Sequence, residues 1–391
     1  MKKSLLLCVL MLPLAIFADI KIVCSPYLQS LGEESVDIVW TTDKASISWV
    51  EIIPDNGKSF YNAPHTKYFA QKFGRKTIGK QHVVHISGLK KNTTYCYRVF
   101  SQEVTHQDEY SILYGAIAAT NVYRKKPLKF TTLNPDKKEI HFSMVNDIHG
   151  RDSIFRRLLN NIPNNNCDFV IFNGDMTSSF SSENQILEGY LSSASELFAS
   201  EIPFYFVRGN HEQRGLMTSD YLNYFPTNSG KPYYSFRQGP AFFLVLDGGE
   251  DKPDNDIEYN GIADFSSYRK EEAQWLKQQV ESEAFRNAPY RIILIHMPPA
   301  RDDNDWYGVT ELRELFIPIL QNKDVNLMLC GHEHHLSIFN EKESSFGFPL
   351  VINSNNTRLD VSVDKSGIEV NAIDTEGKSV GKLSVKHSST Y

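Results

Sequence analysis

The chain has 391 residues, of which 41% are hydrophobic and 23% are charged, and its formal net charge at pH 7 is −6. This length predicts two domains, and the composition is typical of a soluble globular protein with a sizeable core. The sequence lacks the basic surface of a protein that binds DNA or RNA, so we expect no nucleic-acid partner.

The first 18 residues have the pattern of an export signal. Two lysines open the chain, residues 5–17 are almost entirely apolar, and Ala18 is a small residue suited to cleavage. The apolar stretch is short for a membrane span, and no later segment approaches a transmembrane length. We therefore expect residues 1–18 to be a signal peptide and the mature protein to be exported, either periplasmic or secreted. An uncleaved anchor, a buried strand and a lipid anchor at Cys24 are the alternatives.

Residues 20–133 have the pattern of a β-sandwich. Apolar residues alternate with polar ones in two clear stretches, Val36-Ile38-Trp40 and Tyr95-Tyr97-Val99. No helical period of useful length occurs here. The segment GLKKNTTYCYRV, residues 88–99, resembles the strand pair around the core tyrosine of fibronectin type III domains. We interpret this domain as a packing or positioning module.

The cysteines are too few for a disulfide scaffold. Of the five, Cys8 would leave with the signal peptide. Cys24 and Cys96 fall within one domain, and export would permit a bridge between them. The sequence leaves this question open.

The pattern changes after the polar, proline-containing segment 134–138. Apolar strand-like runs now alternate with three stretches of helical spacing, at 154–162, 187–198 and 312–320, and either Asp152 or Ser153 is expected to cap the first helix. Alternation of strands and helices predicts an α/β domain over residues 138–391.

Five apolar runs of this second domain end in residues that bind metals. The runs are 141–145, 169–172, 204–207, 291–295 and 327–330, and they are followed by Asp147 and His149, by Asp175, by Asn210, by His296, and by His332 and His334. Ligand sites of open α/β sheets lie beyond the carboxyl ends of the strands, so we expect these side chains to meet at one rim. Asp, Asn and His together suit divalent Zn, Mn or Fe.

The spacing of these residues indicates two ions. Residues two apart in an extended chain point to the same side, so we expect Asp147 and His149 to face one ion. His332 and His334 can each reach a different ion. Two cations held a few ångströms apart would explain why the histidines crowd together.

The ordered motifs D-x-H, G-D, G-N-H-E, a single His and G-H-x-H are similar to those of the calcineurin-like metallophosphoesterase superfamily. The β-domain, with YSF at 234–236 and QWL at 274–276, narrows this resemblance to purple acid phosphatases. The resemblance covers residue 140 to the C-terminus and implies a four-layer α-β-β-α domain. It implies one metal held by Asp147, His149, Asp175 and His334, a second held by Asp175, Asn210, His296 and His332, and a catalytic His211 beside the substrate.

The chain departs from the purple acid phosphatase pattern at two positions. Those enzymes have a colour-giving tyrosine ligand three residues after the G-D aspartate, where this chain has Ser178, and they usually lack the histidine that stands here as His149. Loss of the phenolate removes an anionic ligand that favours Fe(III). We therefore expect a colourless site with two divalent ions.

The resemblance implies an exported phosphoesterase that hydrolyses phosphate monoesters by attack of a metal-bridging hydroxide. A bound metal lowers the pKa of water to about 7, and paired ions offset the charge that develops on the phosphoryl group. A protonated His211 could donate to the leaving oxygen. The alternatives are a phosphodiesterase acting on nucleotides or phospholipid head groups, and an inactive surface-binding protein. The natural substrate and the oligomeric state stay open.

Several residues near the motifs are expected to have supporting roles. Glu212 is expected to orient a ligating imidazole. Arg208 and Arg214 are expected to be solvated or salt-bridged, with contact to phosphate as the alternative. The acidic segment from Gly248 to Gly261 is interpreted as a lid or rim of the site.

Overall fold

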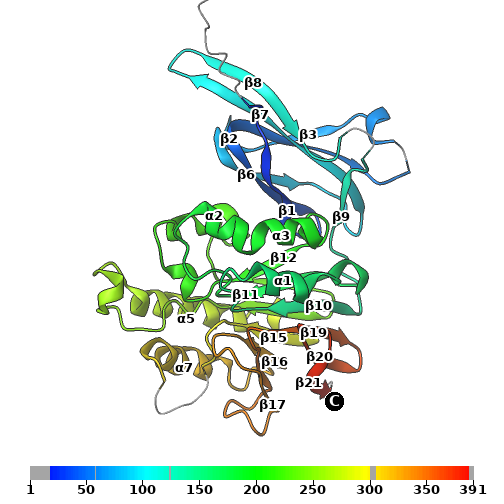
Figure 1. Cartoon of the computed structure of the whole chain (residues 1–391). Helices are drawn as coiled ribbons and strands as arrows, with labels where there is room; N and C mark the ends of the chain where they lie inside the picture. The colour runs from blue at the N-terminus through cyan, green and yellow to red at the C-terminus, as the bar shows by residue number, and fades with distance from the viewer. Residues whose placement is uncertain (1–17, 58, 123–124, 300–304, 387–391) are drawn as a thin grey trace, which may run out of the picture.

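The computed structural model describes residues 18–57, 59–122, 125–299 and 305–386, so the predicted signal peptide lies almost wholly outside the described residues. A β-rich N-terminal domain is stacked on a larger α/β domain (Figure 1). Within the described ranges, none of the helices has the length and apolar character needed to cross a membrane.

The N-terminal domain is built around one long strand. Its strands are β1 (Ile22–Gln29), β2 (Ser35–Pro54), β3 (Thr66–Phe69), β6 (Gly79–Ser87), β7 (Thr94–Gln107), β8 (Ile112–Ala119) and β9 (Leu128–Thr131), with a small hairpin of β4 (Gln71–Lys72) and β5 (Arg75–Lys76). The first half of β2 pairs with β1 and β6, and its second half pairs with β3 and β7. Trp40, Val50 and Tyr97 contribute to one core shared by both halves. The β-rich domain predicted from the alternating pattern is confirmed.

The α/β domain contains two stacked six-stranded sheets. The first has the order β12-β11-β10-β19-β20-β21, with β10 (Ile140–Val145), β11 (Phe169–Asn173), β12 (Phe204–Val207), β19 (Thr357–Asp364), β20 (Gly367–Asp374) and β21 (Ser379–Lys386). The second has the order β13-β14-β15-β16-β18-β17, with β13 (Tyr234–Gln238), β14 (Ala241–Val245), β15 (Tyr290–Leu294), β16 (Leu327–Cys330), β17 (Ser337–Phe339) and β18 (Leu350–Ile352). β10, β11 and β12 are parallel, as are β14, β15, β16 and β18.

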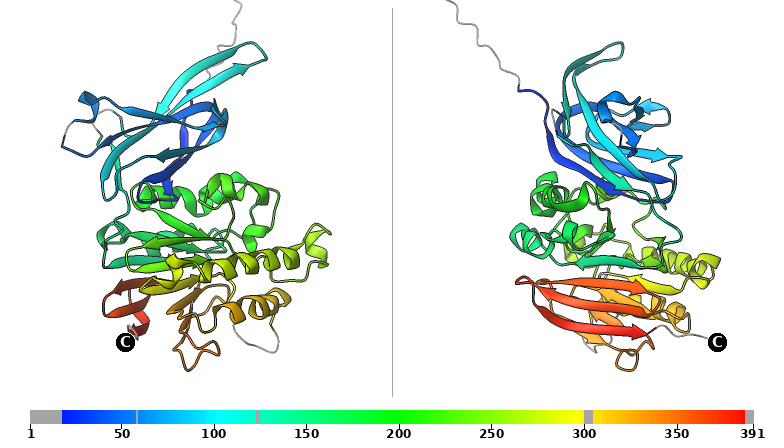
Figure 2. Two further views of the ribbon diagram at one scale, coloured as in Figure 1. Left: turned by 180° about the vertical axis from the view of Figure 1, so that it is seen from behind. Right: turned by 90° about the vertical axis from the view of Figure 1, so that its right-hand side faces the viewer.

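Helices cover the outer face of each sheet, which gives the four layers (Figure 2). They are α1 (Asp152–Leu159), α2 (Glu183–Ile186), α3 (Ser192–Ala194), α4 (Tyr221–Tyr224), α5 (Phe265–Val280), α6 (Glu283–Arg286) and α7 (Tyr307–Leu320). The π-helical turn η3 (Leu187–Leu191) joins α2 to α3, and a second one, η4 (Ser195–Ala199), continues the same helical stretch after α3. Three separate apolar cores lie between the layers, and the middle core lies between the two sheets. The four-layer α-β-β-α fold is confirmed.

The rim at which the five motif strands end is shared by the two stacked sheets. β10, β11 and β12 belong to the first sheet, whereas β15 and β16 belong to the second. The reason is that both faces of these strands are buried. On β14, for example, Phe243 and Val245 enter the core between the sheets, and Phe242 and Leu244 enter the core beneath the helices. The site is therefore assembled across two stacked sheets.

The predicted cap of the first helix was also wrong. α1 begins at Asp152, and neither this residue nor Ser153 caps it. The Asp152 carboxylate accepts hydrogen bonds from Arg156 and Ser193, so it is not available to the backbone N–H groups of its own helix.

The N-terminal domain is fixed to the outer helical layer by hydrogen bonds. The hydroxyl of Tyr27 donates to the carbonyl of Tyr224 at 2.9 Å, and the hydroxyl of Tyr97 donates to the carbonyl of Ser200 at 2.6 Å. Cys24 and Cys96 are both free and buried, so the structure has no bridge between them.

Candidate metal centre

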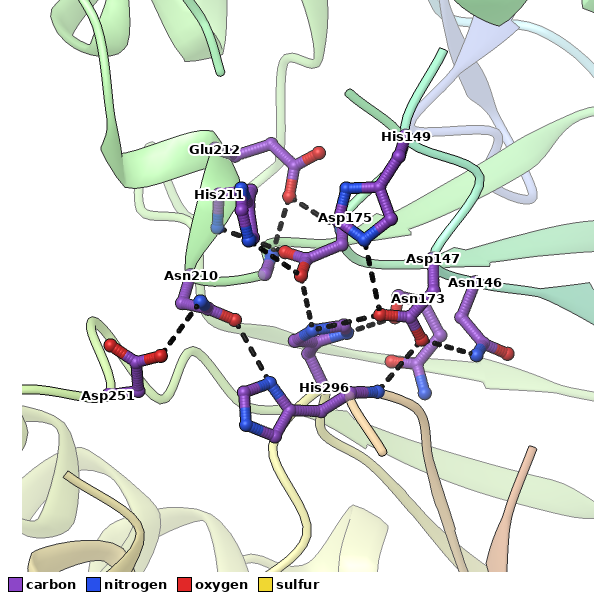
Figure 3. Close-up of polar contacts among 12 residues, drawn as sticks. Asn146, Asp147, His149, Asn173, Asp175, Asn210, His211, Glu212, Asp251 and His296 are labelled. Atoms are coloured by element: carbon purple, nitrogen blue, oxygen red, sulfur yellow. Dashed lines mark hydrogen bonds and ion pairs between the residues drawn. The ribbon is translucent and has the colours of Figure 1, made fainter. Parts of the chain in front are cut away.

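The segments that follow β10, β11, β12, β15 and β16 bring all seven predicted ligands together beyond the carboxyl ends of these strands. Figure 3 labels five of them: Asp147, His149, Asp175, Asn210 and His296. Five of the seven have a left-handed backbone: Asp147, His149, Asp175, His332 and His334, with φ from 49° to 73°. Such a conformation costs a non-glycine residue roughly 1–2 kcal/mol. The extended-chain explanation for the D-x-H spacing was therefore wrong, and tight turns aim these side chains instead.

A first group of donor atoms consists of Asp147, His149 and His334. Asp147 Oδ1 lies 3.1 Å from His334 Nε2 and 3.9 Å from His149 Nε2. The two imidazole Nε2 atoms are 3.2 Å apart. Ligands at about 2.0–2.2 Å from a common ion lie roughly 3–4 Å from one another, so these separations suit one metal.

A second group consists of Asp175, His296 and His332, and Asn210 adjoins it. Asp175 Oδ2 is 3.2 Å from His296 Nε2, and Asn210 Oδ1 is 3.1 Å from His332 Nδ1. Asp175 also forms a third group with His149 and His211, so its carboxylate lies between the first two sets of donors.

His211 lies at the edge of the centre, and its Nε2 is 3.8 Å from Asp175 Oδ2. Its Nδ1 is 2.8 Å from the carbonyl oxygen of Ser178, which can only accept, so this nitrogen carries the hydrogen. The Nη1 atom of Arg214 is 3.4 Å from Nε2 of the same ring. Ser178, which stands where purple acid phosphatases have a tyrosine, is exposed. Its backbone carbonyl orients the His211 ring.

The electrostatics of the centre are set by two buried carboxylates. Burial alone would lower the pKa of His296, but the neighbouring Asp175 and Asp147 carboxylates raise it to about 10. Burial opposes ionisation of both carboxylates, yet the positive His296 lowers the pKa of each. Burial lowers the pKa of both His149 and His332 to about 4, which keeps these imidazoles neutral and able to bind a metal.

Two buried polar atoms that lack hydrogen-bond partners indicate that the side chains of this site suit metal ions. Asp147 Oδ1 and His296 Nε2 make no hydrogen bond with any described residue, although acidic or basic atoms lie 3.1–3.2 Å away. Buried polar atoms are normally paired, so each such atom calls for an explanation. A cation held by the first group would satisfy Asp147 Oδ1, and a cation held by the second group would satisfy His296 Nε2. Glycines leave the necessary room, since a Cβ at Gly209 or Gly331 would collide with the Asp175 or Asp147 carboxylate.

Glu212 supports the centre in a different way from that expected. Its buried carboxylate makes no hydrogen bond with an imidazole of the described residues and instead accepts hydrogen bonds from the backbone N–H groups of Asp175, Met176 and Gly209, at 2.8–2.9 Å. Burial and the nearby Asp175 raise its pKa to about 7. Glu212 therefore joins the turn after β11 to the turn after β12.

Two supporting groups were missed from the sequence. Asn146 donates to Asp147 Oδ2 at 2.6 Å, and Asp251 accepts from Asn210 Nδ2 at 3.4 Å. Asp251 comes from a sixth strand end, that of β14, where an apolar run is also followed by acidic residues. That pattern could have placed Asp251 near the rim, but not in contact with Asn210. Arg208 and Arg214 are salt-bridged, to Asp247 and Glu250, as expected.

Comparison with known proteins agrees with this architecture. The model of the calcineurin-like phosphoesterase family matches residues 140–336, and the model of the purple acid phosphatase N-terminal domain matches residues 23–113. Purple acid phosphatase 21 of Arabidopsis thaliana is 24% identical over 347 residues, which cover 82% of this chain and 68% of the plant protein. Human serine/threonine-protein phosphatase CPPED1 is 28% identical over 143 residues, which cover 34% of this chain and 42% of the human protein. The structure of a purple acid phosphatase from yellow lupin seeds has the same fold, with a TM-score of 0.62 at 13% identity, covering 92% of this chain and 74% of the lupin chain.

Replacement of Glu212 tests its role in joining the two turns. In Glu212→Gln an amide nitrogen takes the place of an accepting oxygen and leaves buried N–H groups unpaired. We expect the free energy of unfolding of the metal-free protein to fall by about 1–3 kcal/mol. Urea unfolding measures this, with Glu188→Gln, at an exposed position of the same domain, as the control. Equal stability of the two variants would contradict the role assigned to Glu212.

Proposed function

Because this chain belongs to the calcineurin-like phosphoesterase family, whose members are metal-dependent phosphoric ester hydrolases, we propose that it is an exported phosphatase that cleaves phosphate monoesters at a centre of two divalent ions. The observation that supports this most directly is that the Asp175 carboxylate groups both with His149, a member of the first donor set, and with His296 and His332 of the second. The N-terminal domain of purple acid phosphatase type supports monoesters as the substrate class.

We assign the ligands by combining the motif order with the distances. One ion would be held by Asp147, His149, Asp175 and His334, and the other by Asp175, Asn210, His296 and His332. When bound, such a pair supplies hydroxide at neutral pH and offsets the charge on the phosphoryl oxygens. Zn, Mn and Fe all suit this mixture of carboxylate, amide and imidazole ligands.

The protein itself contributes orientation and a proton donor. The contact between His211 Nδ1 and the Ser178 carbonyl turns the opposite nitrogen, Nε2, towards Asp175 and the donor groups. Arg214 Nη1, which can only donate, faces Nε2 at 3.4 Å, so Nε2 carries a hydrogen only when the ring is protonated. That hydrogen would then point at a phosphoryl or leaving oxygen of a bound ester. His211 is therefore the residue that we propose as the catalytic donor.

Export and the domain bounds are two further proposals, and both rest on the sequence. Export is supported by the signal-like pattern of residues 1–18. The domain bounds 20–133 and 138–391 are supported by the end of β9 at Thr131 and the start of β10 at Ile140.

Hydrolysis of paired model esters tests the proposed activity. We expect the protein loaded with Zn²⁺ or Mn²⁺ to hydrolyse p-nitrophenyl phosphate faster than bis(p-nitrophenyl) phosphate, and a chelator to abolish both activities. Faster cleavage of the diester would favour a phosphodiesterase. Absence of metal-dependent hydrolysis of either ester would contradict an enzymatic function.

Removal of the His211 imidazole separates proton donation from metal binding. We expect His211→Ala to retain both metals and to lose turnover by about 10²- to 10⁴-fold, which is the usual contribution of a general acid. Elemental analysis and kcat on p-nitrophenyl phosphate provide the two readouts. Loss of a metal from this variant would make His211 a ligand instead.

The colour of the loaded protein tests the nature of the ions. Ser178 replaces the tyrosine ligand of the purple enzymes and offers no phenolate, so we expect no charge-transfer band in the visible spectrum. The spectrum of the protein loaded with iron in air is the most demanding case. A visible band there would indicate a phenolate ligand and an Fe(III) site.

A further inference from the structure

The segment after β14 is a buried support of the metal centre. Of the loop interpreted from the sequence as a lid or rim, the first part, Gly248–Asp251, is buried. The fully buried Arg269 donates to the carbonyl oxygens of Gly248 and Glu250, and the backbone N–H of Gly308 donates to the carbonyl of Asp251 at 2.7 Å. These tethers fix the Asp251 side chain against the centre, so this part of the loop is not a lid.

The Asp251 carboxylate faces the amide of Asn210 (Figure 3). Asn210 Nδ2 donates to Asp251 Oδ2 at 3.4 Å, and Asn210 Oδ1 lies on the opposite side, 3.1 Å from His332 Nδ1. A carboxylate accepts hydrogen bonds and cannot donate them, whereas an amide has one accepting and one donating end. Only one of the two amide orientations is therefore favourable, and it directs the oxygen at the metal ligands.

The other oxygen of Asp251 is held as well. Arg214 Nη2 donates to Asp251 Oδ1 at 3.1 Å, and the same guanidinium forms two 2.8 Å bonds with the buried Glu250 carboxylate. A bidentate arginine–carboxylate pair has a defined geometry. With one oxygen bonded to Arg214 and the other to Asn210, the Asp251 carboxylate has little freedom to rotate.

We propose that Asp251 is a positioning residue for metal binding, which fixes the amide of Asn210 so that its oxygen, and not its nitrogen, faces the second ion. This inference rests on the proposed function, because it takes Asn210 as a ligand of that ion. An amide nitrogen has no lone pair available for a cation, so a reversed Asn210 would remove one ligand. Glu250 and Arg214 hold Asp251 in place.

Asp251→Asn is the direct test, because it keeps the size of the side chain and removes its acceptor-only character. Titration calorimetry of the full-length, metal-depleted chain with Mn²⁺ gives the affinity of each ion. We expect one of the two Mn²⁺ affinities to fall by about 10- to 100-fold, as is usual when a residue that orients a ligand is lost, and the other to stay the same. Asp264→Asn, the same change at the exposed position just before α5, is the control and should alter neither affinity.

A second background separates positioning from a general structural role. In Asn210→Asp the side chain at position 210 has two equivalent oxygens, so no orientation needs to be fixed. We expect Asp251→Asn to cause no loss of affinity in that background. An equal loss in both backgrounds, or no loss in either, would overturn the inference. If the unmodified chain binds fewer than two Mn²⁺ ions, the proposed function fails and this inference fails with it. The same titration therefore separates failure of the proposed function from failure of this inference alone.

Discussion

The arrangement of the site depends on two buried carboxylates whose negative charges must be offset by partners. Asp147 and Asp175 lie at the centre of the rim, and burying a charge without a partner is costly. In this structure His296 lies between them, while the backbone N–H of His332 and that of His211 each donate to one carboxylate. These partners come from both sheets. The stacking of the sheets is therefore what brings the two acids and their counter-charges to one place.

The left-handed backbone of the turns around the site depends on the same two stacked sheets. Five of the seven proposed ligands have a left-handed backbone, and hydrogen bonds between turns hold this conformation. The N–H groups of Asp147 and His149 donate to the carbonyls of Gly174 and Asp175. Strained residues persist only where the surrounding structure over-determines them, and they cluster at functional sites. The rigid two-sheet frame supplies that constraint, and Glu212 extends it to the turn after β12.

The proposed ligands and most of the strands could be predicted from the sequence, because each strand is an apolar run that ends abruptly in polar residues. The division into two sheets could not. Strands such as β11, with Val170 on one face and Ile171 on the other, are apolar on both faces, so their pattern is the same in either sheet. The role of Asp251 was hidden for another reason. An acidic, glycine-rich segment normally indicates an exposed loop, and it is buried here by tertiary contacts, among them those of Arg269 and Arg214.

A crystal structure of the protein grown with Mn²⁺ tests the central claim most directly. The account predicts two ions about 3.5–4 Å apart, with Asp175 bridging them and the Asn210 oxygen on one of them. A single ion, or ions bound without Asp175, would contradict it.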